Sequence, residues 1–167
     1  MVRIAILGAG RIGQVHAANV ARHKDATLVA IADPFISNAQ SLAATWGGIA
    51  IADPLEAINN PDIDAVIIGT PTNTHVELML AAAKAGKAVL CEKPVDLDIR
   101  KAVAAEEALG EQRKKVMLGF NRRFDPGFTE IKQRIQRGDI GDLHQVMICS
   151  RDPGLAPLGY LQTSGGI

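Results

Sequence analysis

Two kinds of segment alternate along the chain. Short, continuous apolar runs predict strands covered on both faces, and between them apolar residues recur with helical spacing. The predicted strands are 2–7, 27–33, 48–52, 64–69, 87–92 and 115–120. The predicted helices are 11–24, 37–46, 54–59, 74–85 and 99–112. This order predicts an α/β fold, a doubly wound parallel sheet with right-handed crossovers.

The helix after the fourth strand has its own start and stop signals. Thr74 and Glu77 have the T-x-x-E spacing of a capping box, in which the threonine side chain accepts a hydrogen bond from a backbone N–H of the first turn. Gly86 is suited to end the same helix. The sequence therefore predicts a side-chain cap at Thr74.

The first strand runs directly into a glycine-rich turn. Residues 8–13 read Gly-Ala-Gly-Arg-Ile-Gly, and Asp33 ends the next strand twenty residues after Gly13. In this GxGxxG pattern Gly8 allows a tight turn, Gly10 lets the backbone approach a diphosphate, and Gly13 lets the helix lie close to the strand. The combination predicts a dinucleotide-binding Rossmann domain with the diphosphate at the helix N-terminus.

The acidic residue after the second strand predicts the choice of cofactor. Asp33 is placed to accept hydrogen bonds from the adenosine ribose hydroxyls and to repel a 2′-phosphate, which favours NAD over NADP. Arg11 follows Gly10 in the glycine turn, and its guanidinium can partly offset that repulsion. We therefore expect a preference for NAD rather than exclusion of NADP.

Polar residues follow the later strands as well. Ligands of such sheets lie beyond the carboxyl ends of the strands, where residues 69–75, 92–94 and 121–123 are expected. The candidate cofactor-binding residues are Gly8, Ala9, Gly10, Arg11, Ile12, Gly13, Asp33, Thr70, Pro71, Asn73, His75, Glu92, Lys93 and Pro94.

Charge and cysteine content narrow the function classes. Equal counts of 18 basic and 18 acidic residues favour neither nucleic acid nor an anionic membrane as a partner. The two cysteines and four histidines have no metal-ligand spacing, so we expect no metal site and no disulfide framework. The chain contains no apolar run of the roughly 18 residues of a membrane span and no signal-peptide pattern, so we expect a cytoplasmic globular protein.

Several motifs together resemble one family of oxidoreductases. They are the glycine turn 8–13, the strand 64–68 that runs into 70–75, and Cys-Glu-Lys-Pro at 91–94. On these residues the whole chain resembles the Gfo/Idh/MocA oxidoreductase family. Residues 119–125 (Gly-Phe-Asn-Arg-Arg-Phe-Asp) and 150–153 (Ser-Arg-Asp-Pro) resemble its inositol 2-dehydrogenase branch.

The resemblance implies an NAD-dependent dehydrogenase of a cyclic polyol such as myo-inositol. Lys93 matches the family lysine that contacts the nicotinamide ribose and the substrate hydroxyl, where a buried ammonium holds the developing alkoxide. Pro94 matches a proline often found in cis, and Arg123 and Asp152 match positions that contact the polyol. For a longer protein, the resemblance implies a homo-oligomer, either a dimer or a tetramer.

These polar side chains also have structural interpretations. Lys93 is alternatively an exposed lysine at a strand end, and Arg122, Arg123 and Asp125 are alternatively a solvated salt-bridge cluster. His75 either contacts the cofactor or is a residue of a helix end. Surface roles are expected for His16 and His23, a structural role on a strand for His144, and a small buried side chain, not a nucleophile, for Cys91.

The last part of the chain predicts an incomplete second domain. Residues 1–123 are expected to form the NAD-binding domain, and 124–167 the start of a domain for substrate binding and oligomerisation. A helix at 127–137, a turn at 138–141 and a strand at 143–150 would begin an open α/β sheet whose other strands are missing. Such a lone strand is a liability for stability.

The glycine pair Gly165-Gly166 indicates where the catalytic histidine is expected. Gly165-Gly166 resembles the pair that, in inositol dehydrogenases, opens a helix carrying an aspartate and the histidine that acts as general acid and base. The chain stops at Ile167, before both, so we expect it to be inactive alone. Two functions remain open: the amino-terminal part of a dehydrogenase of myo-inositol, another inositol isomer or a sugar, and a dinucleotide-binding module without catalysis, such as a redox sensor.

Overall fold

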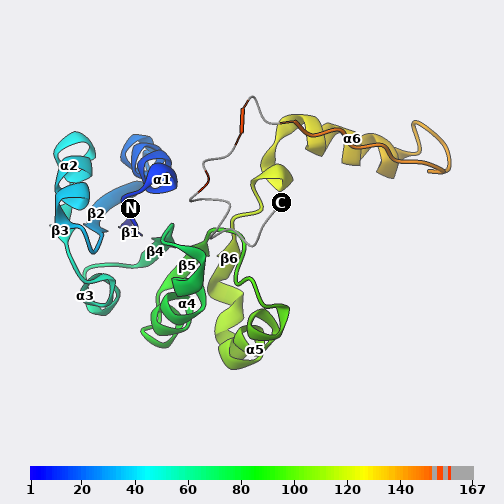
Figure 1. Ribbon diagram of the computed structural model, residues 1–167. Coiled ribbons are helices and arrows are strands. Elements are labelled where there is room, and N and C mark those ends of the chain that lie inside the picture. The colour runs from blue at the N-terminus through cyan, green and yellow to red at the C-terminus, as the bar shows by residue number, and fades with distance from the viewer. Residues whose placement is uncertain (152–153, 156–157, 159–167) are drawn as a thin grey trace. The chain divides into compact units, whose positions relative to one another are not determined.

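The computed structural model describes residues 1–151, 154–155 and 158 (Figure 1). Its strands are β1 (Val2–Leu7), β2 (Ala26–Ala32), β3 (Ile49–Ile51), β4 (Ala65–Ile68), β5 (Ala88–Cys91) and β6 (Val116–Leu118). Its helices are α1 (Arg11–Arg22), α2 (Ile36–Trp46), α3 (Pro54–Asn59), α4 (His75–Lys84), α5 (Ile99–Leu109) and α6 (Pro126–Arg137). All strands and helices predicted between residues 2 and 120 are present.

The six strands form one sheet in the order β3-β2-β1-β4-β5-β6, and every neighbouring pair is parallel. The central strand β1 pairs with β2 on one side and with β4 on the other. The chain therefore winds outward from the middle in both directions, which confirms the predicted doubly wound sheet. At the point of reversal, the carboxyl ends of β1 and β4 leave room for a ligand.

Two apolar layers cover the sheet. Ile6 of β1 belongs to a buried cluster with side chains of α1 and α2, whereas the next residue, Leu7, belongs to one with side chains of α3, α4 and α5. Figure 1 shows α1 and α2 on one side of the sheet and α3, α4 and α5 on the other. Burial of a side chain of this size contributes about 1.5–3 kcal/mol, so the two layers hold the strand ends in fixed places.

Aspartates begin several of the helices. Asp53 accepts a hydrogen bond from the backbone N–H of Leu55 at the start of α3, and Asp98 does the same for Arg100 at the start of α5. The predicted cap of α4 is wrong. The hydroxyl oxygen of Thr74 lies 2.7 Å from that of Thr70 and 2.8 Å from the carbonyl oxygen of Pro71, because a 3₁₀ turn, Thr72–Thr74, precedes the helix.

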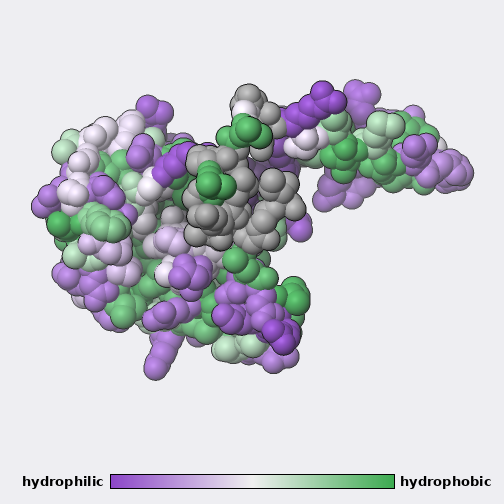
Figure 2. All heavy atoms as spheres, viewed as in Figure 1, coloured by the Kyte–Doolittle hydropathy of each residue, from purple (hydrophilic) through white to green (hydrophobic). Residues whose placement is uncertain are grey.

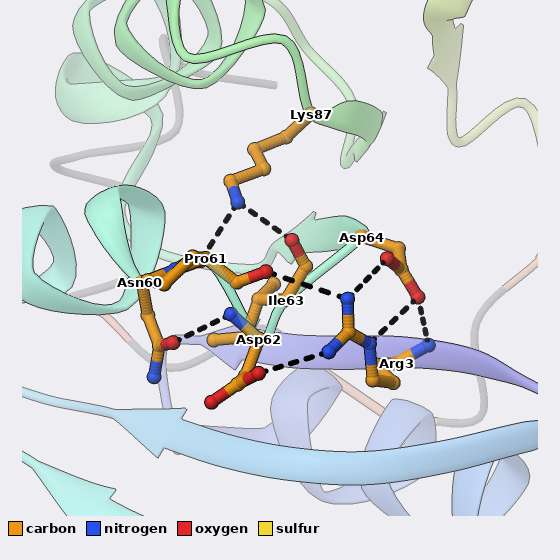
Figure 3. A network of polar contacts seen from close by, with 7 residues as sticks. All are labelled: Arg3, Asn60, Pro61, Asp62, Ile63, Asp64 and Lys87. Carbon is orange, nitrogen blue, oxygen red and sulfur yellow. Dashed lines mark hydrogen bonds and ion pairs between the residues drawn. The ribbon is translucent and has the colours of Figure 1, made fainter.

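A polar network fastens the loop before β4 to β1 (Figure 3). The guanidinium of Arg3 donates to Asp62 at 3.0 Å and to Asp64 at 2.9 Å. Hydrogen bonding to Arg3 lowers the pKa of Asp64 to about 2. Lys87 directly precedes β5, and its ammonium donates to the backbone oxygens of Asn60 at 2.7 Å and Ile63 at 2.6 Å.

Replacing Lys87 with methionine is expected to lower the free energy of unfolding by about 2–3 kcal/mol. Lys87 is 9% exposed, so two carbonyl oxygens would lose a charged donor in a place that water reaches poorly. Urea unfolding followed by circular dichroism measures the change. Lys84→Met, at an exposed position of α4, is the matched control. Equal urea midpoints for the two variants would contradict a stabilising role for the Lys87 ammonium.

A second unit begins at Phe120 and is separate from the compact unit Met1–Gly119. Its helix α6 confirms the helix predicted at 127–137. Asp125 accepts hydrogen bonds from the backbone N–H groups of Gly127 and Phe128 at the start of the helix, and Gly138, with a φ of 76°, follows its end.

The predicted strand at 143–150 is wrong. These residues are exposed and adopt no regular structure, because no described segment of this unit offers a strand for them to pair with. The structural role expected for His144 on that strand is therefore wrong as well. Apolar side chains of the unit, such as Phe128 and Ile131, remain exposed. Figure 2 shows hydrophobic atoms, in green, on the surface around α6. Within the described residues, no helix is long and apolar enough to cross a bilayer.

Candidate functional site

The turn after β1 has two positions at which only glycine fits. Gly8 has a φ of +99°, and a Cβ there would lie 2.7 Å from the carbonyl oxygen of Gly69. A Cβ on Gly13 would lie 1.9 Å from the carbonyl oxygen of Gly8, so α1 packs directly against the end of β1. At Gly10, by contrast, no atom of the described residues other than Gly10 itself and its two chain neighbours lies within 4 Å of where a Cβ would be. The turn thus presents bare backbone to a ligand, as a diphosphate requires.

The amino end of α1 has the properties of an anion site. Gly10 is the N-cap residue, and in the described part of the chain no side chain caps the helix and no acidic residue lies in its first turn. The free backbone N–H groups and the helix dipole therefore favour a negative group. Arg11 is exposed at the first helical position and adds positive charge. Diphosphate binding stays a prediction, and this geometry fits it.

Asp33 joins the glycine turn to the end of β2. Its side chain is buried at 8% exposure, and the carboxylate accepts hydrogen bonds from the backbone N–H of Ala9 at 2.8 Å and of Phe35 at 2.9 Å. Each carboxylate oxygen keeps a second lone pair that can accept a ribose hydroxyl. The predicted ribose contact stays a prediction, but Asp33 has a structural role too, because it fixes the turn against β2.

The loop after β4 lies beside the glycine turn. A Cβ on Gly69 would lie 3.0 Å from the side chain of Ile12, so the loop backbone packs closely against the first turn of α1. Farther along the loop, Thr70 is half-buried, while Pro71 and Asn73 are exposed and open to a ligand. The structure therefore brings the start of this loop together with the turn after β1, as the order of the strands predicts.

His75 occupies a different place from the one expected of a cofactor contact. The side chain is 1% exposed, with Nδ1 2.7 Å from the carbonyl oxygen of Pro94 and Nε2 2.9 Å from that of Thr70. Backbone carbonyls only accept hydrogen bonds, so a ring nitrogen of His75 that carries a hydrogen donates to the carbonyl it faces. Both ring nitrogens face backbone carbonyls in a buried place, so His75 connects the loop after β4 to the segment after β5.

The carboxylate of Glu92, directly after β5, contacts α1. Glu92 Oε1 lies 2.8 Å from Nε2 of His16, and each of the two side chains is 16% exposed. Glu92 also packs on the end of β6, where a Cβ on Gly119 would lie 3.0 Å from its Oε2. The surface role expected for His16 is therefore wrong, because its ring forms a largely buried pair with a residue of the candidate site.

Lys93 and Pro94 follow at the same edge of the sheet. The Lys93 side chain is exposed and has no hydrogen bond or ion pair with a described residue, so the expected burial of its ammonium is wrong for this structure. The Lys93–Pro94 peptide bond is cis, as the resemblance implies. Cys91 is fully buried, and burial raises the pKa of its thiol to about 12. The burial confirms the small buried side chain predicted for Cys91, and its lack of nucleophilic function stays a prediction.

Arg123 lies in the second unit. Arg122 and Arg123 are exposed and line a cavity of about 410 Å³ together with Phe128, Thr129 and Lys132. The guanidinium of Arg122 lies 5.3 Å from the centre of the Phe128 ring. Within the described residues neither arginine pairs with Asp125, whose carboxylate caps α6 instead. The polyol contact of Arg123 stays a prediction, and Asp152 lies outside the described residues.

Sequence reasoning missed the links made by the two histidines. His16 and Glu92 are 76 positions apart, and His75 and Pro94 are 19 apart, so no local pattern marks either pair. The strand order gives only a general signal, because it brings the residues that follow β1, β4 and β5 to one edge of the sheet. In the described part of the chain, no group of three or more histidine, cysteine, aspartate or glutamate residues is arranged to hold a metal ion.

The strand order, the glycine turn and Asp33 together define a dinucleotide-binding Rossmann domain. Residues 2–120 match the Gfo/Idh/MocA model, described as an oxidoreductase family with an NAD-binding Rossmann fold. The chain belongs to that family, and its first unit is an NAD-binding Rossmann domain.

Known relatives of the chain include inositol dehydrogenases. The chain is 47% identical to an inositol 2-dehydrogenase of Rhizobium meliloti, with 99% of the chain and 50% of the relative aligned. The crystal structure of a myo-inositol dehydrogenase from Corynebacterium glutamicum superposes with a TM-score of 0.93 at 53% identity, over 99% of this chain and 50% of that one. A scyllo-inositol dehydrogenase from Lactobacillus casei, solved with NAD(H) and scyllo-inositol, gives a TM-score of 0.80 at 33% identity, over 85% and 43% of the two chains. The chain thus spans about half the length of the curated relatives that it matches.

Proposed function

We propose that the chain is the cofactor-binding, amino-terminal half of an NAD-dependent dehydrogenase. Its substrate is a cyclic polyol, with myo-inositol first among the candidates, and the reaction moves a hydride from a ring secondary alcohol to the nicotinamide. The observation that carries this proposal is Lys93, whose exposed ammonium has no partner among the described residues and lies at the same sheet edge as the glycine turn and Asp33. A pure sensor would not need a cation at that place.

Each part of the site has a separate task in this reaction. The N-terminus of α1 holds the diphosphate, and Asp33 accepts from the adenosine ribose. NAD, when bound, supplies the acceptor for the hydride. Lys93 donates to the substrate hydroxyl and stabilises the negative charge that develops on its oxygen. The proton goes to a histidine that we place, from the family resemblance, in the part of a longer protein that follows residue 167.

The proposal extends to the organisation of that longer protein. We assign residues 1–123 to the NAD-binding domain and 124–167 to the start of the domain that completes the polyol pocket, with Arg123 and Asp152 as contacts of the polyol. The compact unit that ends at Gly119 supports a boundary in this region. We further propose a cytoplasmic homo-oligomer, a dimer or a tetramer.

A substrate comparison tests the proposed activity. The longer protein is incubated with NAD and, in turn, myo-inositol, scyllo-inositol and glucose, and NADH formation is followed by absorbance. We expect kcat/KM to be highest for an inositol, because the relatives aligned over 99% of the chain include an inositol 2-dehydrogenase and a myo-inositol dehydrogenase. A preference for glucose would support the dehydrogenase activity but contradict the proposed substrate. No turnover with any polyol would favour a dinucleotide-binding module.

Replacing Asp33 with serine is expected to reduce the preference for NAD over NADP by about tenfold or more, which corresponds to about 1.4 kcal/mol of differential binding. The variant loses the negative charge that repels a 2′-phosphate, while Arg11 remains. Titration calorimetry with both oxidised cofactors gives the ratio of the two Kd values. The ratio of the two Kd values is the readout because Asp33 also holds the glycine turn, so its loss weakens the binding of both cofactors.

The exposed Asp25, at the far end of β2, supplies the matched control as Asp25→Ser. The assignment of Asp33 as the selecting residue is wrong if the unaltered chain binds NADP as tightly as NAD.

A further inference from the structure

The residue before Lys93 is anchored through its side chain. Glu92 is held by His16 of α1 at 2.8 Å and by close packing on Gly119, which leaves its side chain 16% exposed. Its backbone N–H donates to the carbonyl oxygen of Ile68, which continues the ladder between β5 and β4 by one residue. Glu92 is therefore fixed at both its backbone and its carboxylate.

The residue after Lys93 is anchored through its backbone. The carbonyl oxygen of Pro94 lies 2.7 Å from Nδ1 of His75, and the other ring nitrogen of His75 lies 2.9 Å from the carbonyl oxygen of Thr70. The His75 side chain is 1% exposed, so water competes little for these contacts. The imidazole thus ties the segment after β5 to the loop after β4.

We infer that His16 and His75 are positioning residues, which hold the backbone on both sides of Lys93 and so direct its ammonium. The inference rests on the proposed function, in which Lys93 contacts the substrate. The Lys93 side chain has no partner of its own among the described residues, so the backbone on its two sides is what fixes the point from which it extends.

The two anchors also relate Lys93 to the cofactor. His16 lies on α1, whose N-terminus is the candidate diphosphate site, and His75 lies at the start of α4, after the loop that packs on α1. A shift of about 1 Å in a catalytic group can cost about 100-fold in rate. Residues that fix Lys93 relative to the nucleotide therefore act on turnover more than on cofactor affinity.

Backbone mobility in this chain tests the inference without any turnover. We compare ¹⁵N relaxation of the Lys93 amide in His16→Leu, which removes the contact with Glu92, and in His16→Gln, whose side-chain amide can donate to the same carboxylate. His23→Leu, on an exposed residue next to the end of the same helix, is the matched control. The order parameter of Lys93 is expected to fall from about 0.85 to below about 0.6 in His16→Leu, and to stay near its original value in His16→Gln and His23→Leu.

His75→Leu is expected to have the same effect on Lys93 through Pro94. Because His75 is fully buried, this variant can fail to fold, and the decision then rests on the His16 variants alone. The inference is overturned if the Lys93 amide is as rigid in His16→Leu as in the unaltered chain, or if His16→Gln is as mobile as His16→Leu.

Kinetics of the longer dehydrogenase provide the second readout. His16→Leu is expected to lower kcat by about 10- to 100-fold while the Kd for NAD changes by less than about threefold, and His16→Gln is expected to restore most of kcat. An unchanged kcat overturns the inference. If the unaltered protein shows no turnover, the proposed function fails instead, and the mobility of Lys93 still decides whether the two histidines position it.

Discussion

Replacing Lys93 with methionine is expected to lower kcat of the longer dehydrogenase by at least about 100-fold, the usual size of the loss when a group that assists proton transfer is removed. Methionine keeps much of the length of the side chain but has no proton to donate and no charge to set against a developing alkoxide. The Kd for NAD is expected to change by less than about threefold, because Gly10, the amino end of α1 and Asp33 are all unaltered.

Stopped-flow measurement of NADH formation gives kcat, and a separate NAD titration gives the Kd for NAD. Lys101→Met, at an exposed position of α5, is the matched control and should turn over normally. Near-normal kcat for Lys93→Met would make this residue an ordinary exposed lysine at a strand end, and the reaction would then need a different group to stabilise the alkoxide.

The sheet could be predicted because its strands are covered on both faces. A continuous apolar run such as 65–68 has no other favourable place, and the glycine turn and Asp33 fix the first βαβ unit. The strand predicted at 143–150 also contains a continuous apolar run, 146–149, yet it does not form among the described residues, because a strand also needs a neighbour. Apolar pattern alone cannot say whether that neighbour is present.

The parts of the candidate site that a short sequence motif defines could be predicted. The contacts between residues that lie far apart in the sequence could not. Topology places the ends of β1, β2, β4 and β5 at one edge, so the positions of Gly10, Asp33 and Lys93 follow from the order of the strands. The pairing of Glu92 with His16 depends on side-chain directions across the sheet edge, and so does the burial of His75. The sequence therefore predicted which segments lie at the carboxyl edge of the sheet, but not which side-chain contacts fix these segments in place.

The chain as given is expected to bind NAD and to produce no NADH. The compact unit Met1–Gly119 contains the glycine turn, Asp33 and the loops that follow β4 and β5, so the residues proposed for the nucleotide are present together. Binding should be weaker than in a longer protein, because a covering domain would remove more of the cofactor from water. Titration calorimetry with NAD measures this affinity, and Asp33→Ser in the same experiment shows whether the binding is at the predicted site.

Turnover should fail for two separate reasons. In the proposed reaction the alcohol proton goes to a histidine beyond residue 167, and the polyol finds only part of its pocket, so both proton transfer and orientation are lost. The assay is NADH formation by the purified 167-residue chain with saturating NAD and myo-inositol. Turnover at an ordinary dehydrogenase rate, on the order of 10 per second, would show that the chain holds its own acid and base and that our placement of that group is wrong. The absence of NAD binding would contradict the expectation in the opposite way, because it would mean that the first unit needs the rest of a second domain to keep its nucleotide site.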